Sequence, residues 1–262
     1  MSDSNQSYEP QDSTLVTLAE EGRTIHPVTR AGKIHHQSST DTLNLFFLLF
    51  DSLAKTDALA KSLAKENPEL AAQFPTDPNF PTLGPYGLAL QKHSQPFLQM
   101  FICRFVDQFS TYLSEVIREV LHSRPEILRS GEQVRVDYVL QFSSVEELTT
   151  NLIDRKVADL SYRGFVELEK WFADQLGLSL VDRKDARNDL IEVIETRNAF
   201  VHNRGIIGSK YCRNVANSPF SLGQERTVDW DYLVHTFTVL LGCGHALDEV
   251  LGAKFSIDGS EI

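Results

Sequence analysis

The spacing of apolar residues constrains the fold of this chain more than any other feature of the sequence. Between positions 97 and 121, large apolar side chains recur every three or four residues, as Phe97, Phe101, Phe105, Phe109 and Leu113 do. Such spacing places them on one face of an α-helix, which has 3.6 residues per turn. Most other apolar segments share this period, and alternation with period two is confined to 134–139. The sequence therefore predicts an all-α protein, a helical bundle.

The periodic segments divide the chain into three regions. Residues 1–38 are polar and offer little apolar surface to bury, so we expect a disordered tail. The doublet His35-His36 falls in this tail without a ligand partner at a metal-binding spacing, and we interpret it as solvated. Residues 39–95 are expected to hold an N-terminal helix and a proline-rich connection, and residues 96–255 the main helical domain.

Local signals set the expected ends of the helices. Ser144 and Glu147 match a capping box, in which a hydroxyl and a carboxylate satisfy backbone amides at a helix start. Gly177 is typical of the C-terminal end of a helix, and Asp185 is typical of the start of the next helix. The expected helices are 41–65, 97–121, 144–159, 165–177, 185–205 and 230–250.

The composition limits the kinds of binding partner that this chain is expected to have. The net charge of −11 and the pI near 5.2 disfavour non-specific binding to nucleic acid, so we expect no DNA partner and only a local RNA contact. No apolar run approaches the ~20 residues that span a bilayer, and the N-terminus lacks a secretion signal pattern, which predicts a soluble, cytoplasmic protein without membrane contact. Cys103, Cys212 and Cys243 are expected to be reduced thiols buried as small hydrophobic residues.

The segment 190–205 contains the side chains best suited to catalysis. On a helix its apolar residues form one arc, and its polar residues Glu192, Glu195, Thr196 and Asn203 lie opposite. Inside or beside the apolar arc, however, lie a guanidinium, an amide and an imidazole. A guanidinium directed into an apolar surface costs several kcal/mol unless it is paired or lines a cleft. We therefore select as candidate catalytic residues Arg197, Asn198 and His202.

The run from Arg197 to His202 resembles the Arg-x4-His signature of the HEPN superfamily, including the Asn after the Arg and the helix-ending Asn203-Arg204-Gly205. The resemblance implies a HEPN-like bundle and a homodimer whose cleft cleaves RNA through attack of the ribose 2′-hydroxyl, without metal or cofactor. His202 would be the general acid or base, Arg197 would stabilise charge in the transition state, and Asn198 would position one of them. Many members are toxins or antiphage effectors, which implies a neutralising antitoxin as a further partner.

A locally basic segment follows the motif. Between positions 197 and 226 the chain has five basic side chains and one acidic one, so this is the surface where phosphate contacts are expected. The alternative is that these cations only complement a helix end and solvate a loop. Our candidate substrate-binding residues are Arg204, Lys210, Tyr211 and Arg213.

Two other functions stay open from the sequence. A catalytically silent module that dimerises or binds a protein would pair Arg197 with a carboxylate such as Asp154 or Glu167. A nucleotide-binding regulator would use Arg197 on a phosphate without cleavage. Arg163 is either a second phosphate contact or an ordinary turn residue. His235 and His245 lack a second ligand pair, so we expect no zinc site there.

Overall fold

The computed structural model describes residues 27–67, 69, 83–128, 133–181 and 183–257. Over these residues the structure is helical and contains no strand, only an isolated bridge between Ile206 and Glu225, which confirms the all-α prediction. The helices are α2 (Arg30–Glu66), α4 (Pro85–Lys92), α5 (Ser94–Ser123), η1 (Pro125–Leu128), α6 (Val136–Val139), α7 (Val145–Arg163), α8 (Phe165–Trp171), η2 (Phe172–Leu176), α9 (Lys184–Asn203), α10 (Ser209–Asn214) and α11 (Trp230–Phe255).

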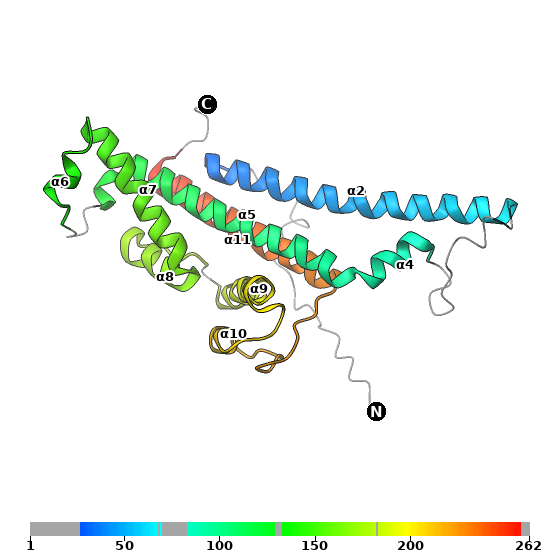
Figure 1. The fold of residues 1–262 in the computed structure, drawn as a ribbon. Coiled ribbons are helices and arrows are strands. Elements are labelled where there is room, and N and C mark those ends of the chain that lie inside the picture. Colours follow the sequence, from blue (N-terminus) through cyan, green and yellow to red (C-terminus); the bar gives the residue numbers. More distant parts are fainter. Residues whose placement is uncertain (1–26, 68, 70–82, 129–132, 182, 258–262) are drawn as a thin grey trace.

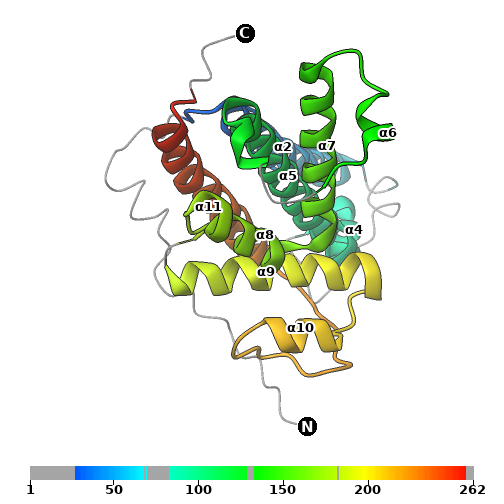
Figure 2. The same ribbon diagram turned by 90° about the vertical axis from the view of Figure 1, so that its left-hand side faces the viewer.

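Three long helices form one side of the molecule. Helices α2, α5 and α11 lie side by side with their axes roughly aligned, and α2 runs antiparallel to α5 and α11 (Figure 1). Helix α9 crosses them at a steep angle: it is seen end-on in Figure 1 and lengthwise in Figure 2. Helix α10 lies on the outer side of α9. The bundle therefore has two sides, with α2 on one and the α9–α10 pair on the other.

Helix α5 supplies the centre of the core. Its periodic apolar residues are almost fully buried, and Ile102, Phe105 and Val116 are each 1% exposed or less. Helices α2, α7, α9 and α11 all pack against it. The predicted helix 97–121 is confirmed, with three more residues at its start and two at its end. The period of α5 therefore organises the bundle as the sequence indicated.

The predicted tail was wrong where it meets the fold. Helix α2 begins at Arg30 rather than Asp41, while residues 1–26 lie outside the described part. Its first turn is fixed by the buried carboxylate of Asp248 on α11, which accepts hydrogen bonds from the Val28 and Thr29 amides at 2.6 and 3.2 Å. Thr29 in turn caps α2. A partner 219 residues away stabilises this start, and no local pattern could indicate it.

The two histidines of that segment are not solvated. His35 is 3% exposed and stacks on Tyr112, with ring centroids 5.0 Å apart. His36 Nδ1 lies 2.9 Å from Nε2 of His245, which is 5% exposed. Burial lowers the pKa of His35, and likewise of His245, from 6.5 to about 4. These histidines thus belong to the contact between α2 and α11, and the lowered pKa values leave His35 and His245 uncharged at neutral pH.

The proline-rich connection is partly helical. Residues 68 and 70–82 lie outside the described part, but α4 follows at Pro85, and Pro96 sits in the first turn of α5. The Asp57 carboxylate on α2 accepts hydrogen bonds from the amides of Gly84, Tyr86 and Gly87 at 2.7–3.1 Å. Because unpaired amides at a helix start favour a negative charge, Asp57 holds α4 against α2.

Other local signals correspond closely to the structure. The Ser144 side chain accepts a hydrogen bond from the Glu147 amide and caps α7, which ends at Arg163 rather than Asp159. Helix η2, which continues α8, ends at Gly177 in the left-handed conformation, at φ 59°. The alternation at 134–139 does not form a strand, and its residues Val136–Val139 form the short helix α6. Within the described part of the chain, no helix combines the length and apolar character needed to cross a membrane.

The buried histidines predict a loss of stability in mild acid. Because their folded pKa values lie below the unfolded one, the unfolded chain binds more protons, and the free energy of unfolding decreases as the pH falls from 6.5 toward 4. Each of the two histidines should lower the free energy of unfolding at pH 5 by about 2 kcal/mol relative to pH 7.5. Urea unfolding at pH 7.5 and pH 5 measures this, and combining His35→Gln with His245→Gln should flatten the difference. The exposed control His93→Gln should retain it; an unchanged double variant would contradict the assignment.

Candidate functional site

The three candidate catalytic residues line one pocket. It has a volume of about 960 Å3 and lies among α5, α9, α10 and the turn between α7 and α8. Arg197, Asn198 and His202 all project into its lining from α9. Arg163 lines it from the turn, and Lys210 from α10. The helical placement inferred from the sequence therefore brings the guanidinium, the amide and the imidazole to one cavity.

Arg197 is held in place but is still accessible. Its Nη2 lies 2.6 Å from Oδ1 of Asp107 on α5, and its Nη1 donates to Oδ1 of Asn198 at 3.4 Å. The side chain is 25% exposed, while its Nε is buried with no partner among the described residues. The expected alternatives Asp154 and Glu167 are not its partners, since Asp154 pairs with Arg118. The Arg197 fork therefore faces the pocket with one side neutralised by Asp107.

Asn198 and His202 lie one turn apart on the same side of α9. The Asn198 amide donates to Oε2 of Glu195 at 3.4 Å, so it links Arg197 to an acidic neighbour. His202 is exposed in the last turn of α9. The helix ends directly after it, where Arg204 and Gly205 adopt left-handed conformations at φ 53° and 80°. The imidazole is thus open to a ligand that enters the pocket.

The predicted substrate-binding residues separate into two groups. Lys210 lines the pocket and lies 3.8 Å from Glu195, and its side chain is 62% exposed. Arg204 and Arg213 are exposed but do not line the pocket. Tyr211 lines it but is 2% exposed, and its hydroxyl donates to Glu192 at 2.8 Å. Of the four, Lys210 alone combines exposure with a place in the pocket.

The polar side of α9 is buried, contrary to expectation. The sequence placed Glu192, Glu195, Thr196 and Asn203 opposite the apolar arc, where polar side chains are usually solvated. Thr196 is instead fully buried and Glu195 is 7% exposed, while Asn203 is exposed. The segment 204–229 folds back over this side, joined to itself by the bridge between Ile206 and Glu225. Helix α9 is therefore covered on two sides, by α5 and α11 and by this returning segment.

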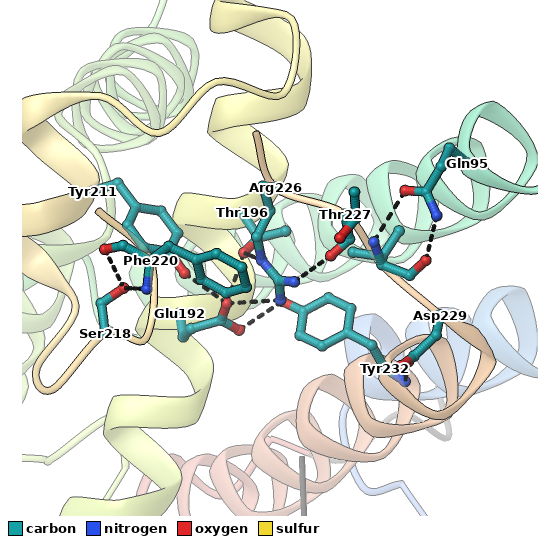
Figure 3. A network of polar contacts seen from close by, with 11 residues as sticks. Gln95, Glu192, Thr196, Tyr211, Ser218, Phe220, Arg226, Thr227, Asp229 and Tyr232 are labelled. Atoms are coloured by element: carbon teal, nitrogen blue, oxygen red, sulfur yellow. Dashed lines mark hydrogen bonds and ion pairs between the residues drawn. The ribbon is translucent and has the colours of Figure 1, made fainter. Parts of the chain in front are cut away.

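A network of polar contacts around Glu192 holds the segment 204–229 against α9 (Figure 3). Its carboxylate accepts hydrogen bonds from the hydroxyls of Tyr211 and Tyr232 at 2.8 and 2.6 Å and lies 3.0 Å from Nη2 of Arg226. The Arg226 guanidinium also lies between the rings of Phe220 and Tyr232, 4.4 and 4.2 Å from their centroids. Burial, followed by the Glu192 charge, raises the pKa values of both tyrosines. Both hydroxyls therefore remain donors at neutral pH.

Arg226 is consequently not part of a phosphate-facing surface. We counted it among five basic residues of this segment, but it is 6% exposed and neutralised by Glu192. Its role is to hold α10 against α9, because it joins the chain after α10 to the middle of α9. Since α10 forms one wall of the pocket, the network sets the shape of the site.

Sequence reasoning missed Asp107, the ion-pair partner of Arg197. A signal was present, because Arg104 and Asp107 are the only charged residues between 94 and 114, within the most regular apolar helix. A carboxylate there needs a partner as much as a guanidinium on α9 does. The cysteines were foreseen in part, since Cys243 is buried, Cys103 is half-buried and Cys212 is exposed.

No known protein family, curated protein or solved structure matches this chain. Within the described residues, no three His, Cys, Asp or Glu side chains are grouped so that they could hold a metal ion.

The Glu192 network predicts a large effect of Arg226 on stability. Arg226→Met leaves a largely buried carboxylate without its counter-charge and should lower the free energy of unfolding by about 3 kcal/mol. Combining it with Glu192→Gln should recover part of the loss, since the buried charge is then also removed. Urea unfolding of both variants measures this. Arg213→Met, at an exposed position, is the control; equal stability of Arg213→Met and Arg226→Met would contradict the role of the network.

Proposed function

We propose that this chain is a metal-independent endoribonuclease of the HEPN type, with its active site in the pocket on α9. The observation that carries the proposal is the shared placement of Arg197, Asn198 and His202 in one open pocket. Packing alone does not favour a guanidinium on the side of α9 that faces α5. The pocket also contains Lys210 and Arg163 as further cationic groups.

These residues suit cleavage by internal attack. His202 removes the proton from a ribose 2′-hydroxyl, the 2′-oxygen bonds to the adjacent phosphorus, and the bond from phosphorus to the 5′-oxygen breaks. The products are a 2′,3′-cyclic phosphate and a 5′-hydroxyl, whose proton comes from an acid such as His202 of a second protomer. Arg197 stabilises the charge that develops on the phosphoryl oxygens. Asn198 contacts the guanidinium and orients it.

Asp107 has a positioning role in this proposal. It holds one side of the guanidinium at 2.6 Å, so the remaining N–H groups have a fixed direction. A phosphate has to share Arg197 with this carboxylate, which is 48% exposed and therefore well solvated. Asp107 thus fixes the direction of the Arg197 guanidinium but weakens the attraction of Arg197 for a phosphate.

The same ion pair supports a second candidate function. If the pair between Arg197 and Asp107 only joins α9 to α5, the chain is a catalytically silent module that binds a protein partner. Under that function, Asp107→Ala and Arg197→Ala lower stability by similar amounts, and RNA is neither bound nor cleaved. A double-mutant cycle on stability, measured alongside RNA binding, separates the two functions.

The nuclease proposal predicts a specific loss of activity. Full-length protein incubated with a mixed RNA pool in excess EDTA should cleave it and leave 5′-hydroxyl ends, detected by enzymatic labelling. Arg197→Ala and His202→Ala should each lower the rate at least about a hundredfold, because they remove charge stabilisation and proton transfer respectively. Circular dichroism shows whether each variant is folded.

The control for this experiment is Arg213→Ala, which removes an exposed cation outside the pocket. It should keep activity within about twofold if the pocket is the active site. Cleavage that requires added metal, or that persists in His202→Ala, would contradict the mechanism. No cleavage and no RNA binding by the unaltered protein would favour the silent module.

A further inference from the structure

The pocket extends beyond Arg197 along α5, where its wall consists of hydroxyl groups. Three of them follow Asp107 at helical spacing on one side of α5, and the last lies about 10 Å further along the helix axis than Asp107. There Ser114 meets Ser161 of α7, and their hydroxyl oxygens lie 2.9 Å apart. We call this wall the hydroxyl row, and its members are Ser110, Thr111, Ser114 and Ser161.

The hydroxyl row uses its protons within the protein. Ser110, Thr111 and Ser161 each donate to the backbone carbonyl four residues earlier, at 2.8–2.9 Å. Ser114 is placed to donate to the Ser110 carbonyl or to the Ser161 hydroxyl. A hydroxyl that has donated its proton still accepts hydrogen bonds, because its oxygen has two lone pairs. The row therefore suits a ligand that brings donors, such as the amino group of a nucleobase.

An uncovered aromatic ring stands beside the end of the hydroxyl row. Tyr162 lines the pocket and is 93% exposed, the highest value among the large hydrophobic side chains of the described residues. Gly164 turns the chain there at φ 89°, a conformation that suits glycine, so α7 ends and α8 begins beside the ring. A tyrosine that stabilises a fold buries most of its ring. The ring of Tyr162 is instead available to a flat ligand.

We propose that this end of the pocket is a base-binding subsite for single-stranded RNA, in which a nucleobase stacks on Tyr162 and its polar edge faces the hydroxyl row. The proposal rests on the RNA substrate of the proposed function and narrows its class. An aromatic ring accepts any base, because every base has a π-face. In a duplex those faces are covered by the neighbouring base pairs, so an unpaired base is needed.

Fluorescence anisotropy with a labelled 2′-O-methyl RNA strand tests the subsite. This probe lacks the 2′-hydroxyl nucleophile, so binding is measured without cleavage. Tyr162→Ala should raise the Kd at least about fivefold, because the stacking contact is lost. Tyr162→Phe keeps the ring and should stay within about twofold of the unaltered protein. The matched control Tyr86→Ala, at a 46% exposed position on α4 outside the pocket, should not change the Kd.

Two further probes separate stacking from other contacts. A strand of the same length without bases keeps its phosphates, so the unaltered protein and Tyr162→Ala should bind it with Kd values within about twofold of each other. A duplex of the same sequence should bind more weakly than the single strand, and Tyr162→Ala should not weaken it further. An equal effect of Tyr162→Ala on the probes with and without bases would overturn the proposal.

The binding and cleavage experiments fail in different ways. If RNA is cleaved through Arg197 and His202 but Tyr162→Ala binds the probe as tightly as the unaltered protein, the base-binding subsite is overturned and the nuclease stands. If the probe is bound through Tyr162 but RNA is not cleaved, the subsite is supported and the nuclease mechanism is contradicted. If the unaltered protein neither binds the probe nor cleaves RNA, both proposals are overturned, and the exposed ring then suits a protein partner.

Discussion

The carboxylate of Glu192 is the interaction on which the candidate site depends. Four donors converge on it: Thr196 from α9 itself, Tyr211 from α10, Arg226 from the chain that leads into α11, and Tyr232 from the first turn of α11. A largely buried charge with this many partners tolerates few other arrangements, because each partner left unpaired would cost free energy. The network therefore specifies one path for the segment 204–229, and that path gives the pocket its outer wall.

Helix α9 consequently has two polar regions with different roles. The region around Glu192 and Thr196 is closed and holds the fold together. The region around Arg197 and His202 opens into the pocket and is available for chemistry. The sequence pattern indicated the second region but not the burial of the first, because polar residues opposite an apolar arc are usually solvated. The distinction rests on Arg226, which supplies the buried counter-charge from 34 positions further along the chain.

The sequence predicted those features that depend on nearby residues. The extent of α5, the cap at Ser144 and the helix end at Gly177 each follow from positions a few residues apart, and the structure agrees. The joint exposure of Arg197, Asn198 and His202 to one pocket follows from helical geometry in the same way. The start of α2, the burial of Tyr211 and the partner of Arg197 depend on residues distant in sequence, and these were missed.

The link between Thr29 and Asp248 has a consequence for how the protein is made. These residues are 219 positions apart, so at 5–20 residues per second the ribosome needs on the order of 10–40 s between them. During that interval the first turn of α2 lacks the carboxylate that satisfies its amides, and the adjoining surface contributed by α11 does not yet exist. The nascent chain thus exposes an incomplete bundle until its last long helix emerges, and chaperones have that time to bind it.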